Sequence, residues 1–473
     1  MFPFFNNSTF VMNPSYVADF MLIKLPPELA SLISQEHADL RLDNPTEASL
    51  LLHEWIHYMQ NISTISGIYA FASLIHLWAH FRSTIDTSGE SVASQKLNDN
   101  ANNAVMRTHS YRATARQQRV NGGPLSEERA DFSVVSATTR ETPLAACLPG
   151  EDEEKATLVE CGIQVGSSEE IVVAEVGTLE IMEGLAWMIE SRYLYTYKQF
   201  SKIPKIAPYQ LLLKLCRRIV PDINDNDAIA CGIAALQDRD PPAGLWRILH
   251  GVKAVNSASR RSTVAHLTSH HLTQSWNLIE TLLRQTDDHF PNDEAMGNAV
   301  KHITSLMRSS MVRRRDNPLF ELDTLDRLEQ INETTRATAL RDIIRELSCC
   351  RILSTAGGKP DTIGRDQILS YGHRGTNAEE FDFGHQKLHA ALHFTSLHLK
   401  DDGFSETSSV DVSDKRRECP FYTACTHELR HHMPNLCAHH PWESIKIKTD
   451  PRVACWYRAG VRATRPPHDD PMT

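Results

Sequence analysis

Apolar residues recur at helical spacing along most of the second half of the chain, and this pattern predicts a mainly helical protein. Between about residues 200 and 350 they repeat every three or four positions, as in YQLLLKLCRRIV and TALRDIIREL. This is the period of an amphipathic helix. Residues 46–82 predict two further helices that are apolar on most sides, and residues 28–42 predict a shorter one.

Shorter apolar runs predict a small sheet. Residues 15–25 (SYVADFMLIKL) predict a strand that ends at Pro26-Pro27. Residues 157–166 and 170–176 predict two strands joined by a Gly-Ser-Ser turn, since both are rich in β-branched residues. We therefore expect an α+β fold, predominantly helical, with a small mixed or antiparallel sheet. An edge strand beside a metal-binding helix could pair with an extended peptide substrate.

The composition changes several times along the chain and divides it into five expected parts. Residues 83–155 stand out as a polar insertion, partly disordered, that is a candidate arm for a regulatory protein partner. The other parts are residues 1–82 (strand and metal helix), 156–350 (hairpin and helical domain), 351–410 (helical connector) and 411–473 (a cysteine-rich metal-binding segment).

Residues 53–57 read His53-Glu54-Trp55-Ile56-His57, the pattern of a zinc hydrolase helix. Positions i and i+4 lie on one face of a helix, so both imidazoles can reach one metal ion. The glutamate beside the first histidine can take a proton from a metal-activated water. The alternative is a buried helix whose histidines are satisfied by hydrogen bonds alone.

The surroundings of this motif favour a buried metal helix. Apolar residues flank it on both sides, and Asn44-Pro45-Thr46-Glu47 offers an N-cap, a proline at the first helical position and an acidic first turn. Gln60 follows His57 by one turn and could orient a ligand.

A catalytic zinc site needs a third protein ligand. The best candidate lies in the helical segment Thr178-LEIMEGLAWMIES-Arg192, where Glu183 precedes Gly184 and Glu190 follows two turns later. Together with the first motif, this E-G-x-A pattern resembles the gluzincin metallopeptidases. The resemblance implies a zincin-like fold, His53, His57 and Glu183 as zinc ligands, and Glu54 as general base. Glu180, one turn earlier, is the rival ligand.

The expected function is zinc-dependent hydrolysis of peptide bonds. Tyr193 and Tyr195 follow the Glu183 helix and are candidates to stabilise the oxyanion. Two alternatives remain: a non-catalytic, zincin-like binding or regulatory protein, and a peptidase controlled by a redox- or iron-responsive C-terminal cluster.

Four of the ten cysteines fall close together near the end of the chain, and they are Cys419, Cys425, Cys437 and Cys455. In a reducing compartment, clustered thiols indicate a metal or an iron–sulfur cluster. The C-P-F-x-x-x-C and V-A-C-W elements resemble the cysteine-rich tail of oligopeptide and dipeptide ABC-transporter ATPases. That resemblance implies a 4Fe–4S cluster on these four cysteines. A second, structural zinc site and free thiols stay open as alternatives.

Two further histidine patterns are expected to be structural. His427-Glu428-Leu429-Arg430-His431 repeats the hydrolase motif, but its flanks are polar and it carries a charge between the histidines. The stripe of His385, His389, His393 and His398 could be a second metal site or a proton relay, yet an amphipathic helix explains it more simply.

Composition and charge narrow the partners. The chain is 41% hydrophobic and 23% charged with a net charge of −10, which disfavours broad nucleic-acid binding. Its one basic run, Arg313-Arg314-Arg315, is expected on a solvated helix face. The start of the chain lacks the features of a secretory signal, and the longest apolar stretch, residues 68–81, is too short to span a bilayer. We therefore expect a cytoplasmic protein with reduced cysteines and no membrane partner.

Overall fold

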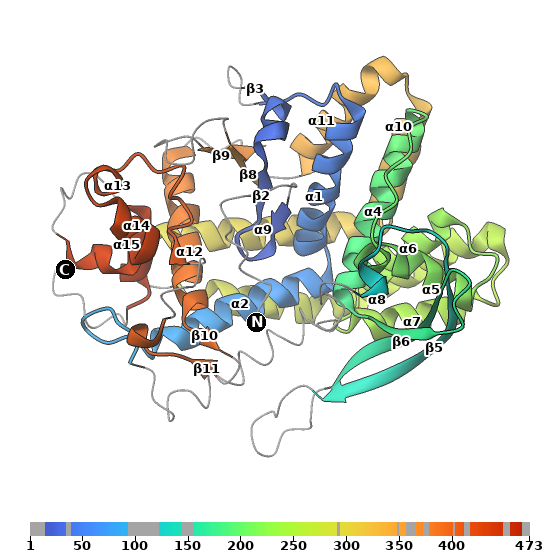
Figure 1. The fold of residues 1–473 in the computed structure, drawn as a ribbon, viewed down its shortest axis with the longest axis horizontal. Coiled ribbons are helices and arrows are strands. Elements are labelled where there is room, and N and C mark those ends of the chain that lie inside the picture. Colours follow the sequence, from blue (N-terminus) through green and yellow to red (C-terminus); the bar gives the residue numbers. More distant parts are fainter. Residues whose placement is uncertain are drawn as a thin grey trace.

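The computed structural model confirms a predominantly helical α+β protein with small sheets (Figure 1). It describes residues 15–34, 39–92, 123–143, 155–290, 294–347, 350–355, 366–371, 378–400, 403–410, 417–447 and 455–465. Figure 1 places α1 and α4 near the middle, the helices α5, α6 and α7 at one end and the cysteine-rich segment at the other.

The two predicted N-terminal helices form as α1 (Pro45–Ser63) and α2 (Ile65–Arg82). The side chain of Asn44 caps α1 by accepting hydrogen bonds from the backbone N–H groups of Thr46 and Glu47. The chain bends between α1 and α2, and Gly67 lies just after this bend. A Cβ at residue 67 would lie 2.3 Å from the carbonyl oxygen of Asn61, so this position needs glycine. Of the helices in the described ranges, none alone could span a bilayer. Only α1 and α2 taken together have the length and apolarity, and they are bent by 76°.

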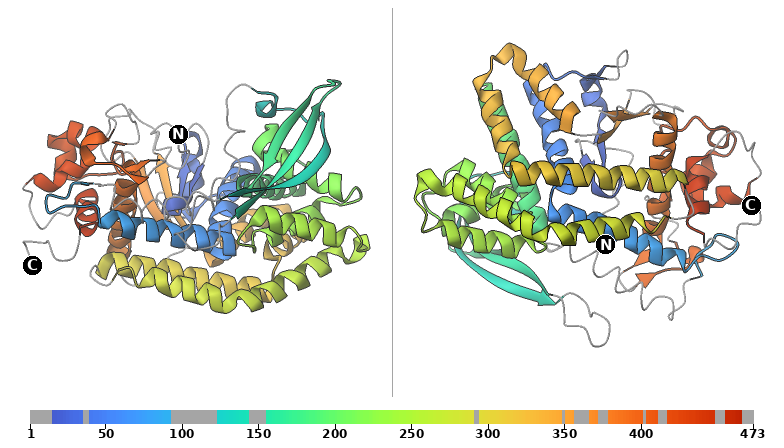
Figure 2. Two further views of the ribbon diagram at one scale, coloured as in Figure 1. Left: turned by 90° about the horizontal axis from the view of Figure 1, so that it is seen from below. Right: turned by 180° about the vertical axis from the view of Figure 1, so that it is seen from behind.

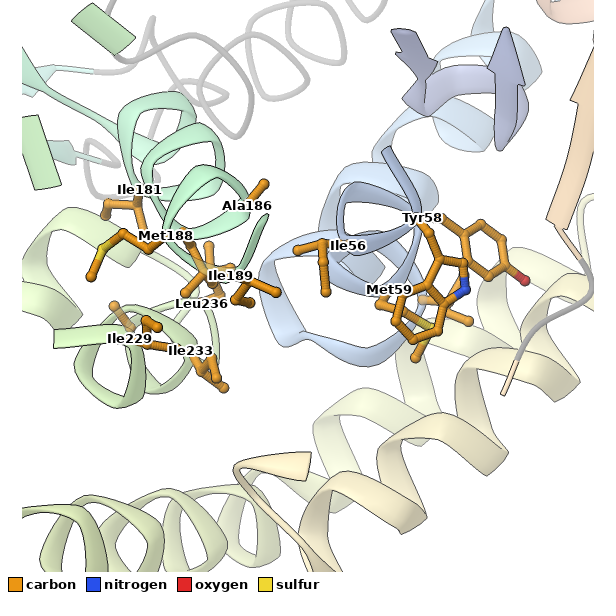
Figure 3. Packing of buried hydrophobic residues seen from close by; sticks show 14 of the residues in the cluster. Ile56, Tyr58, Met59, Ile181, Ala186, Met188, Ile189, Ile229, Ile233 and Leu236 are labelled. Carbon is orange, nitrogen blue, oxygen red and sulfur yellow. The ribbon is translucent and has the colours of Figure 1, made fainter. Parts of the chain in front are cut away.

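The helix α4 (Thr178–Thr196) packs against α1. Figure 3 shows Ile56 of α1 and Ile189 of α4 pointing toward each other, with Ile229 and Ile233 of α6 behind them. This buried apolar contact holds the two helices that carry the candidate ligands in a fixed relation.

The helices that follow surround α1 and α4. The two longest, α8 and α9, run side by side along one side of the molecule (Figure 2). The bounds are α5 (Leu211–Ile219), α6 (Asp225–Ala235), α7 (Pro241–Val252), α8 (Ser257–Asp287), α9 (Glu294–Asp316), α10 (Phe320–Gln330) and α11 (Glu333–Leu347).

The sheet beside α1 has four strands in the order β1-β2-β8-β9 and joins distant parts of the chain. Its strands are β1 (Ser15–Val17), β2 (Leu22–Leu25), β8 (Cys350–Thr355) and β9 (Asp366–Tyr371). β2 pairs in parallel with β8 and antiparallel with β1. Residues 351–371 are therefore in part sheet, where the sequence analysis expected a helical connector.

Two local predictions near the N-terminus were wrong. Residues 15–25 form two strands separated by the 3₁₀ turn η2 (Ala18–Phe20), because Met21 adopts a left-handed conformation with φ 48° that reverses the chain. Residues 28–42 form the 3₁₀ helix η3 (Pro27–Leu32) and the two-residue strands β3 (Ile33–Ser34) and β4 (Asp39–Leu40) instead of an α-helix.

The predicted hairpin forms as β6 (Lys155–Val165) and β7 (Ile171–Val176), and it gains a third strand, β5 (Phe132–Pro143). β5 lies within the segment that was expected to be a polar insertion. Its polarity comes from its exposed face, where Arg140 pairs with Glu160 and Glu175. This sheet packs mainly on α5 and α7, whereas the strands that contact α1 are β1 and β2.

The C-terminal part builds a second, smaller hydrophobic core against the end of α2. Gly460 allows close approach of its last helix to α12, since a Cβ there would lie 2.6 Å from the Cβ of Ala390. The elements are α12 (Ala378–Leu397), β10 (Leu399–Lys400), β11 (Gly403–Phe404), the 3₁₀ turn η7 (Thr407–Ser409), α13 (Glu428–His432), α14 (Pro434–His439), the 3₁₀ helix η9 (Pro441–Lys446) and α15 (Trp456–Ala463).

Candidate metal centre

The structure brings His53, His57 and Glu183 together between α1 and α4. The Nε2 atoms of His53 and His57 lie 3.2 Å apart, and each lies 3.4 Å from the same oxygen, Oε2 of Glu183. Within the described ranges, these are the only three side chains of the metal-binding types whose ligand atoms all lie within 4.8 Å of one another. The predicted ligand set thus converges from two helices far apart in sequence.

These separations fit a single zinc ion. Zinc bonds of 2.0–2.2 Å in a tetrahedron place neighbouring ligand atoms about 3.3–3.6 Å apart. The observed triangle of 3.2, 3.4 and 3.4 Å needs almost no adjustment. The side chain of Glu183 is 22% exposed, so the group of ligands is not completely closed off from solvent.

Hydrogen bonds fix both imidazoles in the tautomer that a metal needs. His53 donates from Nδ1 to the carboxylate of Glu190 at 3.0 Å, and His57 donates from Nδ1 to Oε1 of Gln60 at 2.9 Å. Gln60 donates in turn to the carbonyl oxygen of Met182, next to Glu183. Both Nε2 lone pairs are therefore directed toward the ion site.

We expect Glu190→Gln to weaken zinc binding about 10- to 100-fold, because the amide is a poorer acceptor for the His53 Nδ1–H and lowers the basicity of that ligand. Competition with a fluorescent zinc chelator measures the dissociation constant. Glu170→Gln, on the exposed turn before β7, is the matched control and should bind zinc as the wild type does. Equal affinities for wild type and Glu190→Gln would show that this carboxylate does not position His53.

Charge in the centre is balanced without metal. Burial lowers the pKa of His53, but hydrogen bonds with Glu183 and Glu190 raise it overall to about 10. Burial also opposes ionisation of Glu183, yet the charges and hydrogen bonds of His57 and His53 hold its pKa well below the usual range. The three groups are thus an ion-pair cluster, and zinc would replace protons on the histidines.

Glu54 lies beside the ligands and is buried. Its carboxylate accepts a hydrogen bond from the backbone N–H of Tyr16 in β1. Burial raises the pKa of Glu54, while the nearby charges of His53 and His57 lower it in part. A carboxylate with a raised pKa beside a metal site suits a general base.

Gly184 has a packing role that explains the glycine after the ligand. The π-helical segment η6 (Ile206–Gln210) and the start of α5 press on α4 at this point. A Cβ at residue 184 would lie 2.7 Å from the Cβ of Leu212 and 3.1 Å from the carbonyl oxygen of Tyr209. Only glycine therefore lets η6 pack beside Glu183.

We expect Gly184→Ala to lower the free energy of unfolding by about 1–3 kcal/mol through overpacking, and to weaken zinc binding because α4 or η6 must shift. Chemical denaturation and zinc competition measure the two effects. Gly251→Ala is the control, since nothing lies within 4 Å of a Cβ there. An unchanged Gly184→Ala protein would show that α4 does not need glycine at this position.

The rival ligand and the predicted oxyanion residues lie elsewhere. The carboxylate of Glu180 accepts the backbone N–H of Gly177 and closes the N-terminus of α4. Tyr193 is buried and donates to Tyr197, and Tyr195 is 62% exposed. They lie about 15 and 18 Å along the helix from Glu183, which is too far for an oxyanion donor. The structure therefore does not bring Glu180, Tyr193 or Tyr195 to the ligand group: Glu180 caps α4, and the helix carries the two tyrosines away from Glu183.

Two other tyrosines lie at the site. The ring of Tyr16 stacks on His57 with centroids 6.5 Å apart, and its hydroxyl accepts a hydrogen bond from Asn61. The ring of Tyr209 in η6 lies 6.1 Å from that of His53. No local sequence pattern identifies either residue, because β1 and η6 reach the site only through the tertiary fold.

The four C-terminal cysteines line one cavity, together with Phe421, His427 and Tyr457. Burial raises the pKa of all four thiols, and mutual repulsion of the thiolates adds to the rise at Cys419, Cys425 and Cys437. No three of these sulfurs lie within 4.8 Å of one another. In a tetrahedral zinc site, sulfurs at 2.3 Å from the ion lie about 3.8 Å apart. Some of these sulfurs are therefore farther apart than they would be on a single zinc ion.

The other histidine patterns do not form metal sites. His427 accepts the backbone N–H of Leu429 as the N-cap of α13, while His431 is exposed. His393 of α12 contacts the hydroxyl of Tyr457, and His398, just after the end of α12, contacts Thr407. His389 lies between aromatic rings. These histidines have separate partners and share no ligand position.

No family model matches the chain, and neither the curated proteins nor the solved structures contain a match.

Proposed function

We propose that the protein is a zinc-dependent hydrolase that cleaves peptide bonds. The observation that carries the proposal is the triangle of His53, His57 and Glu183 ligand atoms, with buried Glu54 adjacent. A purely structural metal site has no use for a carboxylate beside its ligands, so Glu54 favours catalysis over simple metal binding. The gluzincin-like assignment of roles is part of this proposal.

Each residue at the site has a separate role in the proposed reaction. Zinc, when bound, supplies a Lewis acid that lowers the pKa of water toward about 7 and polarises a carbonyl. Glu54 takes a proton from the attacking water at its carboxylate and passes it to the leaving amine. The hydroxyls of Tyr16 and Tyr209 are the candidates to donate to the developing oxyanion, in place of Tyr193 and Tyr195.

An extended peptide fits the strand beside the ligands. β1 is the edge of its sheet and, among the described strands, pairs only with β2. Tyr16 of β1 contacts both Glu54 and His57, so a peptide paired with the remaining free backbone groups of β1 would lie close to the candidate ligands. This supports a peptide or protein substrate.

The decisive test measures cleavage of a peptide mixture by zinc-loaded protein, followed by mass spectrometry. Cleavage should stop on chelation, return with zinc, and be lost in a Glu54→Gln variant that still binds zinc. A zinc-loaded wild type that cleaves no peptide in the mixture would favour the non-catalytic binding or regulatory alternative.

We also propose that Cys419, Cys425, Cys437 and Cys455 hold a 4Fe–4S cluster. Soft thiolates suit such clusters, and a cluster of several irons fits sulfurs spaced more widely than a single zinc ion needs. Such a cluster is the centre that the alternative of a redox- or iron-controlled hydrolase requires.

Protein purified without oxygen is expected to absorb near roughly 400 nm and to contain iron and sulfide, and Cys437→Ser should abolish both. Cys216→Ser, at a buried cysteine of the helical core, is the control that should keep the colour. Colourless protein that carries one zinc on these cysteines would instead establish the structural zinc alternative.

A further inference from the structure

A buried arginine lines the cavity of the four C-terminal cysteines without a carboxylate to balance its charge. This residue is Arg430 of the short helix α13, and it is 4% exposed. Among the residues that the structure describes, Arg430 forms no ion pair, and its Nη2 atom is buried without a hydrogen-bond partner. A buried charge normally requires a partner of opposite charge, because leaving water is otherwise too costly.

The surrounding segment fixes the guanidinium in place. Nε of Arg430 donates to the carbonyl oxygen of Tyr422 at 3.0 Å, and the guanidinium carbon lies 3.4 Å from the centre of the Tyr422 ring. In the same helix Glu428 is exposed, whereas Leu429 and Arg430 are buried. The short helix therefore turns a cation, and not an acidic residue, toward the interior of the cysteine-rich segment.

Hydrogen-bond donors also surround the sulfur atoms. The backbone N–H of His427 donates to Sγ of Cys425, with 3.4 Å between the two atoms. The sulfurs of Cys419 and Cys455 accept hydrogen bonds from backbone N–H groups as well. Donors of this kind stabilise a thiolate more than a thiol. The cavity thus offers both hydrogen bonds and a fixed positive charge to sulfur ligands that are negatively charged.

The charge of Arg430 acts on two of the cysteines. Burial raises the pKa of Cys425 and Cys437, and the positive charge of Arg430 opposes this rise at both. Metal binding requires all four cysteines as thiolates. Because four thiolates outweigh the charge of one Zn²⁺ ion or of a 4Fe–4S core, a complete metal–thiolate centre remains an anion. Such a centre is the missing partner for a buried guanidinium.

We propose that Arg430 supplies the counter-charge of an anionic metal–thiolate centre on the four cysteines, and that it raises the reduction potential of a 4Fe–4S cluster there. This role rests on the cysteine centre proposed above. Reduction adds an electron and therefore negative charge to such a cluster, so a guanidinium beside it stabilises the reduced state more than the oxidised state. The same role accounts for a buried arginine between His427 and His431, where the hydrolase-like pattern has a charge.

Redox titration of protein purified without oxygen tests this role. Arg430→Gln should still contain iron and sulfide but have a lower midpoint potential than the wild type. Arg430→Lys keeps the positive charge and should have a potential close to that of the wild type. Both substitutions remove the stacked guanidinium, so a purely structural role would affect them alike. Arg462→Gln, which removes an exposed positive charge from α15, is the control that should leave the potential unchanged.

Iron content decides the case in which Arg430→Gln assembles no cluster. Loss of the cluster in Arg430→Gln, with retention in Arg430→Lys, would also support the counter-charge. Equal midpoint potentials for Arg430→Gln and the wild type would overturn it. The same loss in Arg430→Gln and Arg430→Lys would overturn it too, because the effect would then not follow the charge.

A colourless wild type with zinc on the cysteines would contradict the 4Fe–4S cluster but not the counter-charge. The affinity of the cysteines for zinc then decides, measured by chelator competition in a His57→Ala background that removes the candidate hydrolase site. Arg430→Gln should bind zinc more weakly than Arg430→Lys and the unsubstituted background. Equal zinc affinities in all three would overturn the counter-charge.

Discussion

Replacing Glu54 with glutamine is expected to lower kcat/KM for peptide cleavage about 10²- to 10⁴-fold, the usual contribution of a general base. Glutamine has nearly the same shape, and its amide oxygen can still accept the backbone N–H of Tyr16. It cannot take a proton from water. Because Glu54 is outside the ligand triangle, the variant should bind zinc as the wild type does.

Three measurements separate this loss of catalysis from a loss of zinc, a loss of folding and a general effect of replacing a glutamate in α1. Zinc content and unfolding temperature should match the wild type. Glu47→Gln, in the first turn of the same helix, should keep full activity because the Glu47 carboxylate accepts hydrogen bonds from the N-cap residue Asn44 and from Ser31 of η3, and is not one of the candidate ligands. Undiminished cleavage by Glu54→Gln would rule out the proposed mechanism.

The metal helix could be predicted because its determinants are local. Asn44 caps it, the apolar flanks bury it, and spacing i, i+4 sets His53 and His57 on one face. The choice of Glu183 came from the E-G-x-A pattern, because the resemblance to gluzincins implies that its glutamate is the third ligand. The apolar period predicted only that this segment is a packed helix, and contact between the two helices is a tertiary result that no local pattern specifies.

The rest of the site depends on pairings between distant segments. β2 pairs with β8 more than three hundred residues later, and that sheet places β1 and Tyr16 beside Glu54. Tyr209 reaches the site because η6 packs on Gly184. Neither segment has a periodic pattern that specifies its neighbour. β5 was missed for a different reason: its exposed face is polar, which resembles an insertion in composition.

The basic run at residues 313–315 shows how composition alone misleads. A solvated helix face was expected, but the side chain of Arg314 is completely buried at the end of the metal helix. It donates to the backbone oxygen and the hydroxyl of Ser63, each at 2.6 Å, and to both carboxylate oxygens of Glu321. One guanidinium thus satisfies a last-turn carbonyl of α1 and links it to α9 and α10.

Arg314→Met is therefore expected to lower the free energy of unfolding by about 3–5 kcal/mol, because it leaves the Glu321 carboxylate buried without its partner. Urea denaturation measures the loss. Arg313→Met, in the same basic run but partly exposed, should change stability by less than about 0.5 kcal/mol. The double variant Arg314→Met/Glu321→Leu should recover part of the loss, since an apolar pair removes the unpaired charge. A loss at Arg314 no larger than at Arg313 would show that this buried pair does not hold the end of α1.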